Sequence, residues 1–167
     1  MRYILFDGCN YGKATAGFAM EHQMILLVED SQDDADLTLR AIRKNNIDNR
    51  VVHVRDGAEA IDFLLCGGQY ASRNQRELPQ VILLDLKLPR MSGLEVLKRI
   101  RSEKILSLIP VVILTSSNED RDIIESYKLG ANSYIRKPVD FSSFMGTVRQ
   151  LGLYWLIVNQ NPPAEWR

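Results

Sequence analysis

The chain has 167 residues, 46% of them hydrophobic and 25% charged, a composition typical of a globular protein with a single domain of ordinary size. Its 21 basic and 21 acidic residues balance, which argues against a broadly basic surface for binding nucleic acid. No apolar run approaches the roughly 20 residues of a membrane-spanning helix, so we expect no membrane partner.

The first residues and the two cysteines carry little functional signal. Residues 1–22 hold one short apolar patch and no long apolar core, so they make a poor signal peptide. We expect a weakly ordered N-terminal extension, or sequence upstream of the natural start, because Met20 and Met24 lie where the first strand begins. Cys9 and Cys66 form no CxxC motif and have no histidine at metal-binding spacing, which favours two reduced thiols in a cytosolic protein.

The next part of the chain alternates between strand and helix patterns. Residues 24–30 form an apolar run that ends in two acids, and Ser31 then predicts the N-cap of a helix. A β-branched strand at 51–54 precedes a short helix that Asp56 is expected to cap. The polar stretch at 67–79 contains two glycines and a proline and predicts a long loop.

The same alternation continues to the last helix. Asn118 is expected to cap a helix that runs to Leu129, and Gly130 suits the position after its C-terminus. Asp140 is expected to open the last helix, whose apolar residues lie on one side. The predicted elements are strands at 81–85, 110–117 and 133–138 and helices at 93–103, at 118–129 and from residue 140.

The spacing of the strands predicts the fold class. Their starts lie 22 to 30 residues apart, which suits β–α–β units with right-handed crossovers. Such units build a parallel sheet that is covered on both faces, so its strands are continuously apolar. We therefore predict an α/β fold over residues 23–152, a doubly wound five-stranded parallel sheet with five helices, and a tail at 153–167 that extends the last helix.

Polar residues lie at the ends of these apolar strands. In an open parallel sheet, ligands bind beyond the carboxyl ends of the strands. Taken singly, each residue has an ordinary role as a helix cap, a loop acid, a hydroxyl bonded to backbone or a solvated lysine. The residues are Glu29 and Asp30 after the first strand, Asp85 after the third, Thr115 and Ser116 after the fourth, and Lys137 after the fifth.

Together these residues indicate a site for phosphoryl transfer. Carboxylates held close together repel one another, so we expect a divalent cation among them, and oxygen ligands suit Mg²⁺. Asp85 is the best nucleophile because it ends the central strand, and an aspartate can form an acyl phosphate. The cation and the ammonium of Lys137 would then neutralise the transferring oxygens, and the hydroxyl of Thr115 would donate a hydrogen bond to one of them. The chain has no GxxxxGK[ST] motif, so a nucleotide-binding P-loop is not supported.

The chain resembles the receiver domain of two-component response regulators over residues 23–152. The resemblance rests on the pair Glu29–Asp30, Asp85 in LLDLKLPRMSG, Thr115 in ILTSS and Lys137 in RKP, in this order. It implies a flavodoxin-like fold with strand order 2-1-3-4-5. It also implies that a histidine kinase phosphorylates Asp85, and that the chain is not an enzyme beyond its own phosphotransfer and dephosphorylation.

The metal site that the resemblance implies comprises four residues. Asp30, Asp85 and the backbone carbonyl of Lys87 would hold Mg²⁺, and Glu29 would act through a bound water. The side chain of Lys87, two residues after the acceptor, would either reach the phosphoryl group or point into solvent.

The resemblance also implies a conformational switch. Lys137 would pair with the phosphoryl group next to a cis Lys137–Pro138 bond, and Thr115 would move toward that group. Tyr134 occupies the position of the family's switching aromatic, and an ordinary half-buried strand tyrosine is the alternative. Phosphorylation would shift an existing equilibrium toward a different surface on the fourth helix, the fifth strand and the fifth helix.

The long loop at 67–79 and the tail at 153–167 indicate which partners the chain binds. Both are similar to those of a single-domain subgroup that includes phytochrome-associated regulators, so a phytochrome-type histidine kinase is an expected partner. The segment after residue 152 is too short for a helix-turn-helix unit, so we expect the output to be a protein target, a phosphorelay partner or self-association. Residues 154–158 are apolar, and they either fold back on the core or form the surface of a homodimer.

Two other functions stay open at this point. A metal-dependent phosphatase with an aspartyl nucleophile usually has a second acid two residues after the first, and here Lys87 occupies that position. A receiver fold that serves only for docking, without phosphorylation, would have no need of the acids, Thr115 and Lys137 together.

Overall fold

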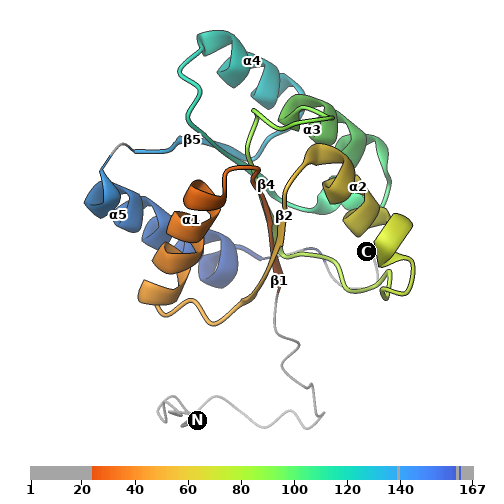
Figure 1. Cartoon of the computed structure of the whole chain (residues 1–167), viewed down its shortest axis with the longest axis horizontal. Helices are drawn as coiled ribbons and strands as arrows, with labels where there is room; N and C mark the ends of the chain where they lie inside the picture. The colour runs from red at the N-terminus through yellow and green to blue at the C-terminus, as the bar shows by residue number, and fades with distance from the viewer. Residues whose placement is uncertain (1–23, 139, 161, 163–167) are drawn as a thin grey trace, which may run out of the picture.

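The protein, seen here in a computed structural model, is an open parallel sheet with helices on both faces (Figure 1). The structure describes residues 24–138, 140–160 and 162. The N-terminal extension expected at 1–22, which includes Cys9, lies outside the described residues.

The sheet confirms the predicted fold class and strand order. Its five strands are ordered β2-β1-β3-β4-β5, and every neighbouring pair is parallel. The strands are β1 (Met24–Val28), β2 (Arg50–Val54), β3 (Val81–Leu84), β4 (Val111–Thr115) and β5 (Ser133–Arg136). The third strand, which Asp85 follows, is therefore the central one.

Of the five described α-helices, α1 and α5 lie on one face of the sheet and α2 and α3 on the other, and α4 contacts α3 and β5 (Figure 1). No helix among the described residues is long and apolar enough to cross a membrane. The α-helices are α1 (Gln32–Lys44), α2 (Gly57–Leu65), α3 (Gly93–Ser102), α4 (Asp120–Lys128) and α5 (Phe141–Gly152). Two 3₁₀ turns, Gly68–Tyr70 and Leu106–Leu108, and a π-helix, Leu153–Val158, complete the described elements.

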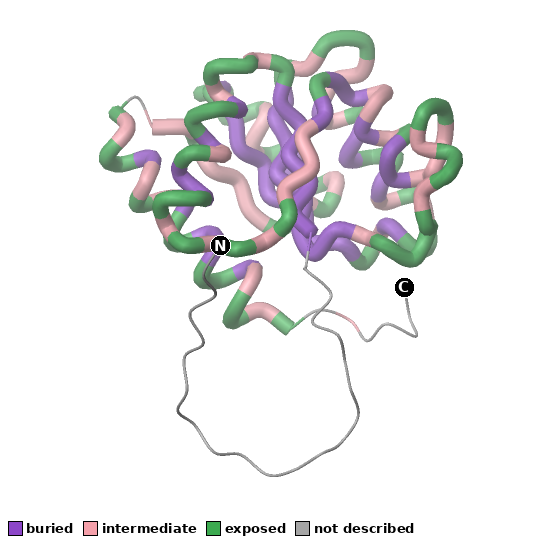
Figure 2. Tube along the Cα trace, turned by 60° about the horizontal axis from the view of Figure 1, so that its bottom comes forward, coloured by how far each residue is buried: buried purple, intermediate pink, exposed green. Residues whose placement is uncertain are grey.

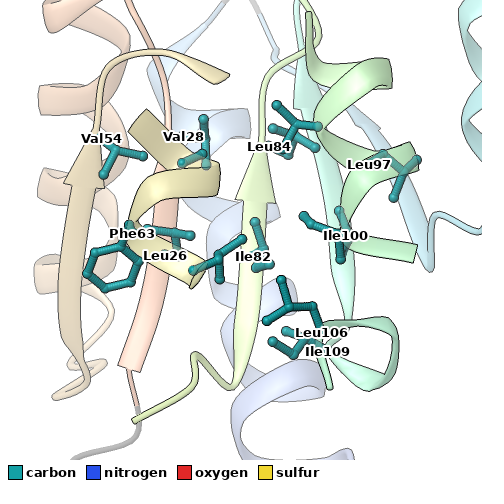
Figure 3. Packing of buried hydrophobic residues seen from close by; sticks show 14 of the residues in the cluster. Leu26, Val28, Val54, Phe63, Ile82, Leu84, Leu97, Ile100, Leu106 and Ile109 are labelled. Carbon is teal, nitrogen blue, oxygen red and sulfur yellow. The ribbon is translucent and has the colours of Figure 1, made fainter. Parts of the chain in front are cut away.

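The continuous apolar runs exist because the inner strands are buried on both faces. Figure 2 shows the middle of the sheet as buried, and every residue of β1, β3 and β4 is in that class. Alternate residues of one strand enter different cores. Leu26 and Ile82 pack with α2 and α3 in the core of Figure 3, whereas Ile25 and Val81 pack with α1 and α5.

Side-chain caps define where the helices begin. The predicted caps Ser31, Asp56 and Asp140 each accept a hydrogen bond from the third residue of their helix. The predicted cap Asn118 is wrong, because α4 is capped by Glu119 without a side-chain bond. The hydroxyl of Ser117 accepts from the N–H of Glu119 at 3.4 Å and donates to Asp122 at 2.5 Å, so it ties down this end of α4 instead.

The long polar stretch between α2 and β3 folds against α2. Tyr70 meets the ring of Phe63 edge-on at 5.1 Å, and its hydroxyl donates to Glu59 at 2.8 Å. The guanidinium of Arg73 lies 3.8 Å from the same Phe63 ring and donates to the Phe63 carbonyl at 2.6 Å. Aromatic and cation–π contacts therefore order this loop.

The apolar tail is buried on one side and exposed on the other. Trp155 is only 9% exposed, and Gln80 donates to the carbonyls of Trp155 and Leu156 at 3.2 and 3.3 Å. The other side of the same π-helix is exposed, with Ile157 at 75%. Part of the tail thus folds back on the core, and part of it presents an apolar surface.

Gly93, the first residue of α3, is expected to be essential for the loop that carries Asp85. A Cβ at this position would lie 2.2 Å from the carbonyl oxygen of Asp85 and 2.7 Å from the Cα of Leu86. We expect Gly93→Ala to lower the free energy of unfolding by about 1–3 kcal/mol, because backbone cannot give way as a flexible side chain can. Urea denaturation of the full chain measures this.

Gly146 provides the matched control for Gly93. It lies in α5, and a Cβ there would meet nothing within 4 Å. Gly146→Ala should leave stability unchanged or raise it by up to about 1 kcal/mol, because alanine favours helix. Equal effects of the two substitutions would contradict the close approach at Gly93.

Candidate functional site

The carboxyl edge of the sheet collects the predicted site residues. Glu29 and Asp30 follow β1, Asp85 follows β3, Thr115 ends β4, and Lys137 lies one residue beyond β5. Because β3 lies between β1 and β4, its carboxyl end is next to the ends of both. Glu29, Asp85 and Thr115 are buried, and the buried strands hold them in place.

Three carboxylates meet at this edge. One oxygen from each of Glu29, Asp30 and Asp85 lies within 4.8 Å of the other two. Glu29 and Asp85 are buried, whereas Asp30 is exposed, so Asp30 is the acid of this cluster that solvent reaches most easily. Hard oxygen donors in this number and spacing fit a divalent cation that keeps part of its water shell.

The ammonium of Lys137 is the counter-charge to these acids. Its Nζ donates to Glu29 Oε2 at 2.5 Å, to Asp34 Oδ2 at 2.8 Å and to Asp85 Oδ2 at 3.0 Å. The Lys137 side chain is only 10% exposed, so these ion pairs are partly shielded from water and stronger than surface pairs. One ammonium thereby links β1, α1, β3 and the end of β5.

The charges of the site do not balance without a further cation. Burial raises the pKa of Glu29 to about 7, and the negative charges of Asp85 and Asp34 also raise it. The hydrogen bond and the charge of Lys137 lower this pKa but offset only part of the rise. Burial also disfavours the charged form of Lys137, but the hydrogen bonds to Asp34 and Glu29 and the charge of Asp85 outweigh burial and raise its pKa. The excess of negative charge is what a bound cation would neutralise.

The carboxylate of Asp85 is oriented from two sides. The N–H of Lys87 donates to Asp85 Oδ1 at 3.2 Å, while Lys137 holds Oδ2. The backbone of Lys87 therefore lies beside the acid, and Lys87 as a residue is exposed. The loop behind them is closed by the N–H of Gly93, which donates to the carbonyl of Leu86 at 3.0 Å.

Thr115 and Tyr134 are connected through Ser117. The N–H of Ser117 donates to the hydroxyl oxygen of Thr115 at 3.3 Å, and the hydroxyl of Tyr134 donates to the carbonyl of Ser117 at 3.4 Å. Burial raises the pKa of Tyr134, and the nearby charge of Asp122 adds to the rise. A movement of Thr115 would therefore be felt at Tyr134 through one short turn.

The peptide bond before Pro138 differs from expectation. No peptide bond between described residues is cis, so Lys137–Pro138 is trans and the expected cis bond is wrong. The trans form is the intrinsically favoured one even before proline. With it, the N–H of Lys137 reaches the Thr115 carbonyl at 2.8 Å, and the ammonium still reaches the acids.

Asp34 is the site residue that sequence reasoning missed. It lies in the first turn of α1, where acids are common because they favour the helix dipole. A signal was nevertheless present in the sequence: Asp34 directly precedes Ala35, the first residue of the apolar stripe of this helix, so it borders the inward side. The structure agrees, because Ala35 and Thr38 are fully buried. What the sequence did not reveal is that α1 turns this side toward Lys137.

Known proteins share this sequence pattern and this fold. The response regulator receiver domain matches residues 25–149 of the chain. A protein from Methanothrix harundinacea named probable methanogenesis regulatory protein FilR2 is 40% identical over 139 residues, which cover 83% of this chain and 87% of that protein. Response regulator Rcp1 from Synechocystis is 38% identical over 142 residues, covering 85% of this chain and 95% of Rcp1.

Solved structures of response regulators superpose on this chain. The phosphorylated cyanobacterial phytochrome response regulator RcpA superposes with a TM-score of 0.79 at 39% identity, covering 85% of this chain and 99% of RcpA. The Mn²⁺-bound form of Rcp1 superposes with a TM-score of 0.77 at 37% identity, over 84% and 99% of the two chains. A protein of similar fold thus binds a divalent cation.

Asp30 is expected to dominate binding of a divalent cation. Isothermal titration calorimetry with Mg²⁺ and with Mn²⁺ should show Asp30→Asn weakening the affinity by at least about tenfold, because one charged oxygen ligand is lost. Asp48→Asn, the same loss of charge at an exposed residue between α1 and β2, should change the affinity by less than about twofold. Equal losses in both variants would mean that general charge, and not this site, attracts the ion.

Proposed function

This chain belongs to the response regulator receiver domain family, and on that premise we propose that it is a signalling switch in which Asp85 accepts a phosphoryl group. One observation carries the proposal. Asp85 shares the ammonium of Lys137 with Glu29 and lies in one carboxylate cluster with Glu29 and Asp30, so an ammonium and a place for a divalent cation both adjoin the acceptor, as phosphoryl transfer requires.

The donor is a phosphohistidine of a histidine kinase. A carboxylate oxygen of Asp85 attacks the phosphorus, the P–N bond of the phosphohistidine breaks, and the imidazole leaves with the bonding electron pair and takes up a proton. The product on this chain is an aspartyl acyl phosphate. Lys137 pairs with the phosphoryl oxygens, and the buried strands keep Asp85 in position for in-line attack.

The cation that we assign to this site is Mg²⁺. Asp30, Asp85 and the backbone carbonyl of Lys87 would hold it, with Glu29 acting through a water. When bound, it supplies positive charge to the transferring oxygens. The three clustered carboxylate oxygens support this assignment, because a hard cation is bound by oxygen ligands.

The phosphoryl group acts as a switch because it adds nearly two negative charges. Thr115 moves toward it, and the link through Ser117 passes that movement to Tyr134 in β5. The affected surface is the one formed by α4, β5 and α5. The chain then catalyses only its own phosphotransfer and dephosphorylation and has no separate substrate.

The partners that we propose are proteins in the cytoplasm. RcpA supports a histidine kinase of the phytochrome type as the donor, because RcpA is a phytochrome response regulator. The output is a downstream protein target or a phosphorelay partner, without nucleic acid or membrane.

A homodimer through the C-terminal face also forms part of the proposal. The π-helix after α5 exposes four large apolar side chains, which would be covered by a second copy. They are Leu153, Tyr154, Ile157 and Val158.

Two alternatives are weaker. A docking module without phosphorylation would not require Lys137 to be buried among three acids. An aspartyl phosphatase would have an acid at position 87, where this chain has an exposed lysine.

Asp85→Asn should abolish phosphorylation. With a radiolabelled acyl phosphate and Mg²⁺, the full chain is expected to take up label that is stable to gel filtration, and Asp85→Asn should take up less than about 1% of it, because a neutral amide is a poor nucleophile. Asp48→Asn is the control and should label normally. If Asp85→Asn takes up as much label as the wild type, Asp85 is not the phosphoryl acceptor. A wild-type chain that neither labels nor binds beryllofluoride with Mg²⁺ would favour the docking module.

Ile157→Glu should dissociate the proposed dimer without unfolding the chain. Ile157 is 75% exposed, so a charge costs the monomer little but would be buried in the interface. Sedimentation equilibrium should show at least about a tenfold weaker dimer, with unchanged thermal unfolding of the monomer.

Trp155→Ala serves as the contrast for Ile157→Glu. Because Trp155 packs on the core, this variant should destabilise the fold by about 3–5 kcal/mol. Unchanged association of Ile157→Glu would exclude this face as the interface.

A further inference from the structure

We propose that Asp34 is a positioning residue that holds the ammonium of Lys137 while Asp85 is unphosphorylated and gives it up when Asp85 carries a phosphoryl group. This inference rests on the proposed function. Asp34 lies in α1, away from the strand ends, and it is not one of the three clustered carboxylates of Glu29, Asp30 and Asp85.

The ammonium of Lys137 has no donor to spare. A lysine has three N–H groups, and here they point to Glu29, Asp34 and Asp85 at 2.5, 2.8 and 3.0 Å. A phosphoryl group on Asp85 brings three strong acceptor oxygens to the same place. The bond to Asp85 can pass to the phosphoryl group, but Lys137 can donate to a second phosphoryl oxygen only if its bond to Glu29 or to Asp34 is broken.

Of the two partners that keep their charge when Asp85 is phosphorylated, Glu29 and Asp34, Asp34 is released at the lower cost. Its side chain is 38% exposed, whereas the side chain of Glu29 is 2% exposed. A carboxylate that loses its counter-ion is stabilised by water if it can reach it, and is strongly destabilised if it cannot. Glu29 is also held from its other oxygen, which accepts from the N–H of Ser31 at 3.3 Å.

The surroundings of Asp34 allow its side chain to turn without moving the helix. Its N–H donates to the hydroxyl of Ser31 at 3.3 Å, and its carbonyl accepts from Thr38 at 2.9 Å, so its backbone is fixed in the first turn of α1. The side chain borders a hollow of about 280 Å³ between α1 and the start of α5, which Leu37 and Phe141 also line. A rotation about the side-chain bonds is therefore sufficient.

The competition has a direct consequence for the phosphorylated state. Every pairing of Lys137 with the phosphoryl group is opposed by the pull of Asp34 on the same ammonium. Asp34→Asn removes the charge of this competitor and keeps its size and an acceptor oxygen. The variant should therefore bind a phosphoryl mimic more tightly than the wild type does.

Titration of the full chain with beryllofluoride at saturating Mg²⁺ tests this. We expect Asp34→Asn to bind about three- to tenfold more tightly than the wild type, the effect of one partly exposed charge-assisted bond. Asp33→Asn is the matched control, because Asp33 is the preceding residue in the same turn and is exposed. It should stay within about twofold of the wild type. An Asp34→Asn affinity equal to that of Asp33→Asn would overturn the inference.

A spectroscopic measurement separates release of Lys137 from simple repulsion by the charge of Asp34. In the wild type, beryllofluoride should move the ¹³C signal of the Asp34 carboxylate toward that of a solvated aspartate, and leave the signal of Asp33 unchanged. An Asp34 signal that stays in place while beryllofluoride binds would refute the release. A wild-type chain that does not bind beryllofluoride at all would instead refute the proposed function, so the two failures are distinguishable.

Discussion

One shielded ammonium, that of Lys137, holds the functional edge of this protein together. It donates to carboxylates that reach it from β1, α1 and the end of β3, and it is itself carried just beyond β5. Burial and mutual repulsion already disfavour the charged form of these acids. Without Lys137 they would have no cationic side chain of the described residues among them. The rest of the site is arranged around this shared charge, and so is the excess of negative charge that makes a divalent cation a fitting ligand.

The sheet supplies the rigidity that this arrangement needs. The inner strands are buried on both faces, so their ends cannot shift without disturbing two cores at once. The loop after β3 is fixed by the close approach of Gly93 to the Asp85 backbone, and the N–H of Lys87 orients the Asp85 carboxylate. A rigid frame with few movable side chains is what a switch between two states requires.

On our proposal, a phosphoryl group on Asp85 would be sensed on both faces of the sheet. The route through Thr115, Ser117 and Tyr134 leads to the face covered by α2 and α3, because Tyr134 packs against that core. The route through Lys137 and Asp34 leads to the opposite face, where α1 and α5 border a hollow. The two routes diverge from one acceptor, so partners on either face could respond to the same event.

The sequence alone determined the strands, their order of appearance and the acids at their ends, because a strand covered on both faces must be apolar throughout and stops where polar residues begin. Family resemblance added the order in the sheet. Only the tertiary structure brought Asp34 to Lys137, 103 positions away, since this contact depends on which side α1 turns toward β5. The role of Ser117 at the start of α4 and the two-sided tail were likewise decided by packing, because local preferences there are weak and long-range contacts outweigh them.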